Sequence, residues 1–404
     1  TIRKNKLRTF LTMLGVFWCI FMLVIMLGAG NGLRNGIMKD FGGTATNSFY
    51  IWTQTTTKSY KGMKPGRNFN YNLDDYKALL QIPELDVVSP MNQSGGYEGE
   101  SNVVHGLKSV AAQIQANYPN TTQIAQVKIS EGRFLNDNDI KESRKICVIG
   151  PRIAETLYKK DEKVIGSYIR INGVYFKVVG LTAIGAAGDE GRQQAQRISV
   201  PFSSFQKAFN FGDVVGWFAI KSKDNVSAEV SEKKVMAILK ERHKIAPDDL
   251  KAIGHFNLEA EYNKLQGLFI GISFLIWIVG IGTLLAGVIG ISNIMLIVVK
   301  ERTKEIGVKR ALGAVPSQII GQIVIESVFL TSIAGYFGLV CGVFILEALD
   351  AAIGNSGEMF TNPTVDLNVA LVALTVLIVS GALAGLIPAS KAIAIKPVEA
   401  LRTE

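Results

Sequence analysis

The chain has 404 residues, of which 48% are hydrophobic and only 19% are charged, and its mean hydropathy is +0.25. Soluble domains carry about 25% charged residues, so this composition excludes a purely soluble enzyme and an intrinsically disordered protein. The formal net charge of +9 would suit a nucleic-acid binder. The basic residues lie beside apolar segments instead, so we predict no nucleic-acid partner.

Four segments carry no charge at all: residues 11–30, 265–299, 327–346 and 367–390. About 20 apolar residues in a helix span the hydrocarbon core of a lipid bilayer, so each segment is predicted to be a transmembrane helix. Residues 31–264 have an ordinary globular composition, and about 230 residues are enough to bury a core. The predicted fold class is a membrane protein with four transmembrane α-helices and an α+β extracytoplasmic domain inserted between helices 1 and 2.

The charges that flank these segments predict the orientation, because lysine and arginine collect on the cytoplasmic side. Residues 347–366 carry acids and no lysine or arginine, whereas the other flanking segments are basic. The basic residues are Arg3, Lys4, Lys6 and Arg8, then Lys300, Arg302, Lys304, Lys309 and Arg310, and finally Lys391, Lys396 and Arg402. We therefore expect a multi-pass protein of the cell inner membrane, with both termini cytoplasmic and the large domain periplasmic.

The first apolar segment follows a basic stretch, which raises the alternative of a cleaved signal peptide. No A-x-A-like site closes the segment, so we expect a retained membrane anchor. The chain opens at Thr1 without a methionine, and we expect that residues before it are missing, including part of an interfacial amphipathic helix.

The second apolar segment is longer than a bilayer requires. A helical pattern begins near Asn257 and runs to Val299, which corresponds to roughly 60 Å against a hydrocarbon core of about 30 Å. The surplus is predicted to project outward as a stalk, and the alternative is a tilted helix with a frayed end. The first helix is expected to continue similarly through Leu33 and Ile37.

Small residues recur at four-residue spacing inside three of the apolar segments, and such rows let helix backbones approach closely. They predict helix–helix contacts within the chain or between copies of it. The rows are Gly282, Ala286 and Gly290, then Gly338 and Gly342, and then Gly381 and Gly385. Glu326 immediately precedes the third uncharged segment and is the exceptional acid of the predicted third transmembrane helix. We expect a structural polar contact for it, with a proton relay as the alternative.

The region between the first two spans is predicted to mix helices and strands. Residues 168–179 alternate apolar and polar side chains around Asn172-Gly173, which indicates a β-hairpin. Strands are also predicted at 145–149 and 214–220, and helices at 74–81 and 228–244. Residues 44–72 are expected to be rich in loops, and residues 185–197 to form a mobile loop.

Motifs for catalysis or cofactor binding are absent from the sequence. There is no G-x-x-x-x-G-K-[ST] phosphate-binding loop, no G-x-S-x-G and no H-E-x-x-H. The three histidines and three cysteines are isolated from one another along the chain. We therefore predict no catalytic residue, no metal and no cofactor bound by this chain.

The segment 299–319 differs from a simple membrane-flanking loop. Glutamates are interleaved with its lysines and arginines, and Ile306, Val308 and Leu312 add apolar side chains. Orientation in the membrane requires only the basic residues. The pattern therefore suggests a helix with i,i+4 ion pairs that serves as a docking surface for a soluble protein.

Residues 301–314 strongly resemble the E-R-T-x-E-I-G-x-x-x-A-L-G-A signature of the FtsX/MacB-like permease family of ABC transporters. Residues 385–402 are similar to the family's G-x-x-P-A-x-x-A-x-x-x-x-P-[IV]-E-A-L-R ending, and residues 3–16 look like its first span. Weaker similarity to the periplasmic core of MacB-like proteins lies at 131–134 and 145–150. The resemblance covers essentially the whole chain.

The resemblance implies a dimeric permease, either a homodimer or a pair of paralogues, in which the loop between spans 2 and 3 is a coupling helix on an ABC ATPase. This sequence contains no ATPase domain, so the resemblance implies that ATP and Mg²⁺ are bound by a separate partner subunit. It also implies a periplasmic adaptor and an outer-membrane channel as partners. The residues that match the signature, and that would carry the coupling role, are Glu301, Arg302, Thr303, Lys304, Glu305, Ile306, Gly307, Lys309, Arg310, Ala311, Leu312, Gly313 and Ala314.

Combined with the apolar segments, the resemblance predicts a division of the chain into eight parts. They are 1–32 (basic segment and span 1), 33–263 (periplasmic α+β domain with a porter-like lobe and an inserted second lobe), 264–299 (stalk end and span 2), 300–318 (coupling helix), 319–346 (span 3), 347–366 (extracytoplasmic loop), 367–390 (span 4) and 391–404 (cytoplasmic tail). Residues 282, 286, 290 and 326 are the candidates for helix packing or dimer contact.

Three functions fit this architecture. The first is a MacB-like exporter permease that uses ATP hydrolysis by its partner to drive a periplasmic conformational change and to export an antibiotic, a peptide or another envelope substrate. The second is a lipoprotein-releasing permease. The third is a non-transporting transmitter that activates a cell-wall hydrolase or a sensor. The size of the large domain favours the first two, and in none of them is the chain itself an enzyme.

Overall fold

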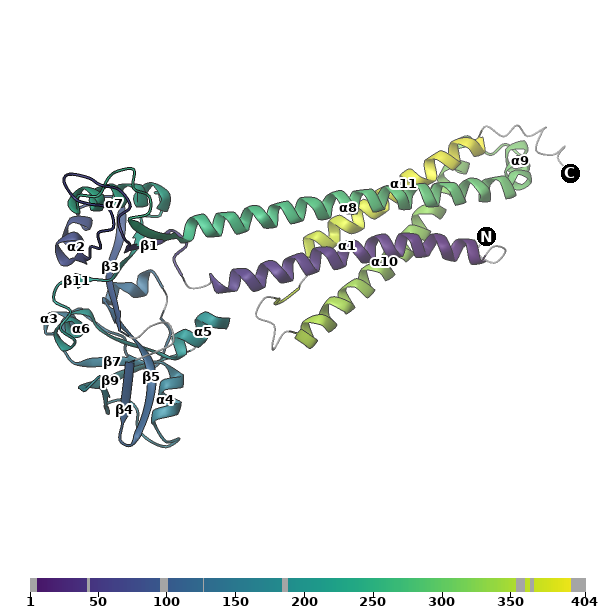
Figure 1. Ribbon diagram of the computed structural model, residues 1–404. Helices are drawn as coiled ribbons and strands as arrows, with labels where there is room; N and C mark the ends of the chain where they lie inside the picture. The colour runs from purple at the N-terminus through teal and green to yellow at the C-terminus, as the bar shows by residue number, and fades with distance from the viewer. Residues whose placement is uncertain are drawn as a thin grey trace. The chain divides into compact units, whose positions relative to one another are not determined.

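The computed structural model describes residues 6–41, 44–94, 101–125, 127–183, 188–353, 360–363 and 367–393. The chain divides into two compact units (Figure 1). The helical unit comprises Thr1–Met38 and Gly267–Glu404, and the globular unit comprises Lys39–Gln266. We describe each unit separately.

The globular unit contains the strands β1 to β13 and the short helices between them. The strands are β1 (Ser48–Thr53), β2 (Tyr71–Asn72), β3 (Leu85–Ser94), β4 (Ser101–His105), β5 (Lys108–Asn117), β6 (Ile129–Gly132), β7 (Ile146–Ile149), β8 (Tyr168–Ile171), β9 (Val174–Thr182), β10 (Arg197–Pro201), β11 (Val214–Val215), β12 (Trp217–Ser222) and β13 (Ile253–Asn257). The helices are α2 (Leu73–Leu79), η1 (Pro119–Gln123), α3 (Asp137–Lys141), α4 (Pro151–Leu157), α5 (Gly188–Ala195), α6 (Phe202–Ala208) and α7 (Ala228–Arg242).

Most of these strands form one large sheet that closes on itself at one end. Strand β10 pairs in parallel with β5 and antiparallel with β7, which closes the ring β5–β10–β7–β9–β8–β4. From β5 the sheet continues as an open layer in the order β3–β12–β1–β13. Closure removes the free edges of the ring, which would otherwise expose unpaired backbone groups. The core runs through both parts, from Phe49 and Ile51 on β1 to Ile114 on β5.

The predicted hairpin at 168–179 is confirmed. Strands β8 and β9 pair antiparallel with Ile171 opposite Val174. The two turn residues, Asn172 and Gly173, have φ values of 45° and 91°. Positive φ at both positions is the geometry of a type I′ turn, which asparagine and glycine tolerate best. The local sequence therefore determines this hairpin.

The helices predicted at 74–81 and 228–244 correspond to α2 and α7, and the strand predicted at 145–149 corresponds to β7. Helix α2 begins with a capping box in which Asn72 and Asp75 exchange side-chain to backbone hydrogen bonds. The predicted strand 214–220 is two strands, β11 and β12, which belong to different sheets. Gly216 separates them, and a Cβ atom there would lie 2.7 Å from the side-chain oxygen of Asn92.

One prediction for this unit is wrong, and another is incomplete. In the range 185–197, expected to be a mobile loop, residues 188–195 form helix α5, whose final residue Ala195 is buried against Gly150, and residues 185–187 lie outside the described residues. The polar sequence of α5 shows no apolar periodicity from which a helix could be predicted. Residues 54–70 form turns and loops, as predicted for the loop-rich range 44–72, but this range also contains the buried strand β1. Its alternation of Phe49 and Ile51 with Tyr50 and Trp52 is a strand pattern that the surrounding polar residues obscured.

The helical unit consists of long apolar helices and one short helix. They are α1 (Lys6–Asp40), α8 (Leu258–Glu301), α9 (Thr303–Ala311), α10 (Pro316–Ile353) and α11 (Leu367–Ile393). Three helices among the described residues are long and apolar enough to cross a membrane, over Met13–Lys39, Leu258–Glu301 and Pro316–Ala352. Helix α11 contributes a shorter apolar stretch, Ile378–Ile393.

Helix α8 is a single helix of 44 residues, which corresponds to about 66 Å at 1.5 Å per residue. This length confirms the prediction of a helix that is longer than a bilayer requires. Helix α1 likewise continues through Leu33 and Ile37 to Asp40. These lengths exceed the roughly 30 Å hydrocarbon thickness of a membrane.

Two of the three rows of small residues lie at helix contacts within the chain. A Cβ atom on Gly338 of α10 would lie 2.6 Å from the backbone oxygen of Phe17 on α1, and one on Gly381 of α11 would lie 2.2 Å from Thr331 of α10. The third row faces open space, since nothing lies within 4 Å of a Cβ atom on Gly282 or Gly290. Close approach of the backbones explains the first two rows.

Candidate coupling site

The signature residues lie where α8, α9 and α10 meet. Helix α8 ends at Glu301, and Arg302 (φ −102°, ψ 15°) interrupts the helix before α9 begins at Thr303. The Thr303 hydroxyl donates a hydrogen bond to the backbone oxygen of Lys300 at 2.7 Å, and so satisfies a carbonyl at the end of α8. The chain therefore changes direction at Arg302, and α9 is a separate short helix (Figure 1).

The A-L-G-A part of the signature ends α9. Gly313 has a φ of +94°, which side chains disfavour. Its N–H donates to Arg310 O at 3.1 Å, and the N–H of Ala314 donates to Lys309 O at 3.1 Å. This pair of bonds is a Schellman motif. Pro316 then starts α10, at a position where its missing N–H costs nothing. Gly313 and Ala314 thus have a clear role in shaping this turn.

One face of α9 is buried inside the helical unit. Ile306 and Gly307 are buried. Ile306 belongs to an apolar cluster that includes Met295 and Val299 of α8 and Ile319 and Ile323 of α10. The cluster holds α9 against the two long helices, because moving it away would expose these side chains.

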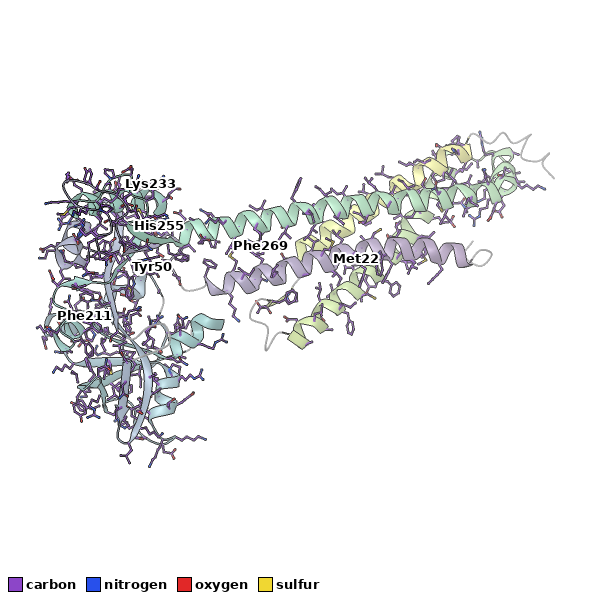
Figure 2. All side chains as sticks on the ribbon, in the orientation of Figure 1. Met22, Tyr50, Phe211, Lys233, His255 and Phe269 are labelled. Atoms are coloured by element: carbon purple, nitrogen blue, oxygen red, sulfur yellow. The ribbon has the colours of Figure 1, made fainter. Side chains whose placement is uncertain are left out.

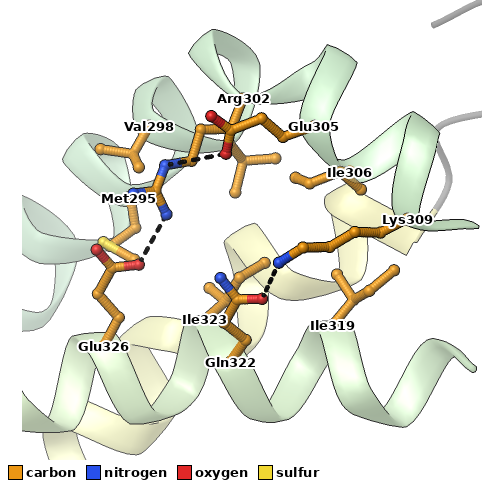
Figure 3. Close-up of a pocket in the computed structure, with 11 residues that line it drawn as sticks. Met295, Val298, Arg302, Glu305, Ile306, Lys309, Ile319, Gln322, Ile323 and Glu326 are labelled. Atoms are coloured by element: carbon orange, nitrogen blue, oxygen red, sulfur yellow. Dashed lines mark hydrogen bonds and ion pairs between the residues drawn. The ribbon is translucent and has the colours of Figure 1, made fainter. Parts of the chain in front are cut away.

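Polar side chains join α9 to α10 beside this cluster (Figure 3). The Arg302 guanidinium lies 3.2 Å from the carboxylate of Glu326 on α10, and 4.0 Å from Glu305 one turn further on. The Lys309 ammonium donates to the side-chain oxygen of Gln322 on α10 at 3.0 Å. These groups and the apolar cluster line a cavity of about 30 Å³. Glu326 therefore makes a polar contact with the segment that follows α8.

A further bond ties α9 to the last helix. A side-chain nitrogen of Arg310 donates to the backbone oxygen of Ile393, the final residue of α11. Ala389 and Ala392 of α11 are buried in the same apolar cluster as Ile306. The first part of the C-terminal motif, up to Ile393, thus packs against α9. Residues 394–402 of that motif lie outside the described residues.

The exposed side of α9, together with the residues just before and after this helix, combines charged and apolar side chains. Leu312 is 83% exposed, Val308 is 43% exposed and Val315 is 50% exposed. The exposed polar and small residues around them are Glu301, Lys304, Glu305, Lys309 and Ala311. We call Val308, Leu312 and Val315 with these five residues the docking face. Exposed apolar side chains ringed by charges are typical of a protein-binding surface.

The structure thus sorts the signature residues into two groups. Ile306 and Gly307 point into the chain, Arg302 and Arg310 fasten α9 to α10 and α11, and most of the others lie on the exposed side. Sequence reasoning did not assign Gln322 or Val315 to this site. Val308, Leu312 and Val315 follow one another at helical spacing, and this pattern could have indicated Val315 from the sequence. Nothing in the sequence indicates Gln322, because only the fold brings it to Lys309.

The described side chains of this junction form ion pairs, hydrogen bonds and apolar contacts, and among them no nucleophile is paired with a base. Within the described ranges no group of three His, Cys, Asp or Glu residues is placed to hold a metal ion. The buried Cys147 of the globular unit is a weak nucleophile, because burial raises the pKa of its thiol.

Comparison with protein families matches nearly the whole chain. Residues 9–238 match the MacB-like periplasmic core domain, and residues 267–397 match the FtsX-like permease C-terminal domain. The second match contains the entire coupling junction.

Among curated proteins, the chain is 27% identical over 402 residues to the pyoverdine export ATP-binding/permease protein PvdT of Pseudomonas syringae pv. syringae, covering 99% of this chain and 58% of that protein. It is 28% identical over 407 residues to the macrolide export ATP-binding/permease protein MacB of Bdellovibrio bacteriovorus, covering 100% of this chain and 60% of that protein. The chain therefore spans about three-fifths of the length of these relatives.

Two solved structures are similar to part of the chain. The periplasmic region of MacB from Actinobacillus actinomycetemcomitans matches with a TM-score of 0.45 and 20% identity, covering 57% of this chain and 97% of that one. The extracellular domain of the noncanonic ABC-type transporter YknZ from Gram-positive bacteria matches with a TM-score of 0.43 and 13% identity, covering 52% of this chain and all of that one (100%).

Proposed function

Because the chain belongs to the FtsX/MacB-like permease family of ABC transporters, we propose that it couples ATP hydrolysis by a partner ATPase to movement of its globular unit and to export of a substrate. ATP and Mg²⁺ would bind to the ATPase, since the 404 residues contain no phosphate-binding loop. The chain would contribute the docking face and the mechanical link.

The observation that carries this proposal is the docking face of α9. An exposed leucine, two exposed valines and alternating charges lie on α9 and in the turn that follows it, and the buried side of α9 packs against three long apolar helices. Movement of a protein bound to this face would therefore be transmitted to the long helices. The role of residues 301–314 as the coupling segment is part of this proposal.

Helix α8 is the proposed lever. It is continuous for 44 residues, and its length of about 66 Å exceeds the thickness of a membrane. A nucleotide-dependent change at α9 would select between two positions of the lever, and the energy of nucleotide binding would set their populations. The scarcity of charge in the apolar helices supports transmission of force, rather than passage of substrate, through them.

We propose four membrane spans, with α11 as the fourth. Its 27 residues correspond to about 40 Å of helix, which is sufficient to cross a bilayer. The basic residues of 300–318 and the acids of 347–366 support cytoplasmic termini and a periplasmic globular unit in an inner membrane.

The orientation can be tested by labelling single cysteines in intact spheroplasts with a membrane-impermeant maleimide. We expect Lys64→Cys, in the globular unit, to be labelled from outside, and Lys304→Cys, on α9, to be labelled only after the membrane is permeabilised. Both positions are exposed in the described chain, so accessibility within the protein does not limit the reaction. Labelling of Lys304→Cys in sealed cells would overturn the proposed topology.

The names of the relatives favour export as the transported process. PvdT is named for export of pyoverdine and MacB for export of macrolides, so we propose export ahead of lipoprotein release or signal transmission. The complete export complex would contain a second copy of the chain or a paralogue, a periplasmic adaptor and an outer-membrane channel. The open row of Gly282, Ala286 and Gly290 is the proposed contact for the second copy.

The docking face is tested by placing a charge at its most exposed apolar residue. Leu312→Glu is expected to weaken binding of the ATPase about 30-fold, because truncation of a central interface residue costs about 2 kcal/mol or more. Reversal of charge at Glu301 and Glu305 is expected to weaken binding as well. The measurement is the affinity of the purified ATPase for the chain in nanodiscs.

Leu250→Glu serves as the matched control for Leu312→Glu. Leu250 is 82% exposed, like Leu312 at 83%, but it belongs to the globular unit. We expect this control to bind the ATPase as the parent chain does. Equal affinity of the Leu312→Glu variant and the control would rule out the docking face.

A further inference from the structure

The first turn of α8 belongs to the globular unit, as α7 does (Figure 1). Side-chain hydrogen bonds join the two helices there. Asn257 caps α8, because its side-chain oxygen accepts from the N–H of Ala260 at 3.0 Å. The amide nitrogen of the same side chain donates to the carboxylate of Glu232 on α7. A single residue thus starts α8 and joins it to α7.

Glu259 makes a second connection from α8 to α7. Its carboxylate accepts from the hydroxyl of Ser227 at 2.9 Å and from the backbone N–H of Ala228, the first residue of α7. The N-terminus of a helix carries a partial positive charge and unpaired N–H groups. The side chain of Glu259 therefore caps α7 although it belongs to α8.

Glu232 is buried and binds two residues of the segment that leads into α8. One carboxylate oxygen accepts from Asn257, and the other contacts the Nδ1 atom of His255 on β13. Figure 2 shows His255 next to the start of α8 and Lys233 on α7. A buried carboxylate is strongly destabilised when its partners leave, so Glu232 opposes separation of α7 from this segment.

The other end of α7 is fastened to α2. The Arg242 guanidinium and the His243 ring each lie 2.7 Å from a carboxylate oxygen of Asp75, a buried residue in the first turn of α2. Burial alone would raise the pKa of Asp75, but hydrogen bonds from His243 and Arg242 outweigh it, and the pKa lies below its ordinary value. The charged form of Asp75 therefore prefers this pairing.

We propose that the start of α8, α7 and α2 move as one rigid body, and that Glu259, Glu232 and Asp75 are positioning residues that pass the movement of α8 to α7 and α2. Glu259 and Glu232 both link the start of α8 to α7, and Asp75 links the other end of α7 to α2. The inference rests on the proposed function, in which α8 is the lever, and it assigns α7 and α2 as the elements that the lever moves.

The test measures two distances by pulsed electron paramagnetic resonance in the full chain with its ATPase in nanodiscs, after replacement of Cys19, Cys147 and Cys341 by serine. Spin labels at Glu241→Cys and Lys264→Cys report the joint between α7 and α8. Labels at Lys264→Cys and Ala352→Cys report the movement of α8 relative to α10. All three label positions are exposed in the described chain.

In the parent chain we expect nucleotide to shift the 264–352 distance and to leave the 241–264 distance narrow and unchanged. Glu259→Ala is expected to broaden the 241–264 distribution and to make it nucleotide-dependent, while the 264–352 shift persists. Glu261→Ala is the matched control, because Glu261 lies in the same turn of α8 and forms its ion pair with the exposed Lys264. For this control the spin labels are placed at Glu241→Cys and Gln266→Cys, so that Lys264, the partner of Glu261, is retained.

The experiment distinguishes failure of the lever from failure of the rigid joint. Absence of a nucleotide-dependent 264–352 shift in the parent chain contradicts the lever and hence the proposed function. A 241–264 distribution that stays as narrow in Glu259→Ala as in the parent chain overturns the rigid joint, whether or not the lever moves. If Glu259→Ala does not fold, Glu259→Asp, whose shorter side chain reaches α7 less well, is expected to give an intermediate width.

Discussion

Replacing Glu326 by arginine is expected to weaken binding of the ATPase about tenfold to a hundredfold, although residue 326 lies outside the docking face. The variant places two positive charges together where Arg302 and Glu326 now lie 3.2 Å apart. Loss of a hydrogen bond between charged groups costs about 1.5–3 kcal/mol. The expected result is that α9 loses its fixed orientation against α10, and with it the alignment of Val308 and Leu312.

The reciprocal variant shows whether the pair itself is responsible. Arg302→Glu alone is expected to weaken binding, and the double variant Arg302→Glu/Glu326→Arg to recover by about 1–3 kcal/mol relative to the sum of the single changes. Glu347→Arg is the control, since Glu347 is an exposed acid further along the same helix. Additive effects of the two single changes would show that Arg302 and Glu326 act independently. The affinity measurement is the one used for the docking face.

Replacing Gly338 by valine is expected to destabilise the helical unit by about 1–3 kcal/mol or more, the usual cost of overpacking. A Cβ atom at this position would lie 2.6 Å from the backbone oxygen of Phe17 and 3.2 Å from the backbone nitrogen of Phe21. Backbone atoms of α1 cannot rotate away as a flexible side chain does, so α1 and α10 must separate. The measurement is the thermal unfolding midpoint of the full chain in detergent.

Gly282→Val gives the matched comparison in the same kind of helix. Nothing lies within 4 Å of a Cβ atom at Gly282, so we expect the unfolding midpoint of the protomer to be unchanged. Self-association, measured by cross-linking in the membrane, is expected to fall because this row is the proposed contact for a second copy. Equal destabilisation by the two variants would contradict the assignment of Gly338 to a contact within the chain. If cross-linking is unchanged in Gly282→Val, the row of small residues at Gly282 is not the contact between two copies.

The long helices and the site segment were predictable from the sequence because their signals are local. An uncharged apolar run needs only its own composition to be recognised as a helix of the membrane, and α8 and α10 follow the predicted segments closely. The turn at Asn172-Gly173 is equally local, since two residues tolerant of positive φ determine it. The position of α9 was predictable from the family signature, which lies in one continuous stretch.

Only the tertiary structure determined which side chains of the α9 segment are buried and which are exposed. Ile306 and Leu312 are both apolar and belong to the same motif, yet one is buried and the other exposed. The difference arises from the break in the helix at Arg302 and from the packing of Ile319 and Ile323 of α10 against Ile306. Glu326 was recognised as unusual from sequence, but its partner Arg302 lies 24 positions away and was found only in the fold.

The sequence by itself determined which segments are apolar, where the family signature lies and which turn closes β8 and β9, because each of these properties resides in neighbouring residues. Only the tertiary structure decided that β10 closes the ring between β5 and β7, that Ala195 of α5 packs against Gly150, and that Glu259 of α8 caps α7. These features depend on contacts between residues far apart along the chain. Their free energy comes from packing and hydrogen bonds that no local pattern records.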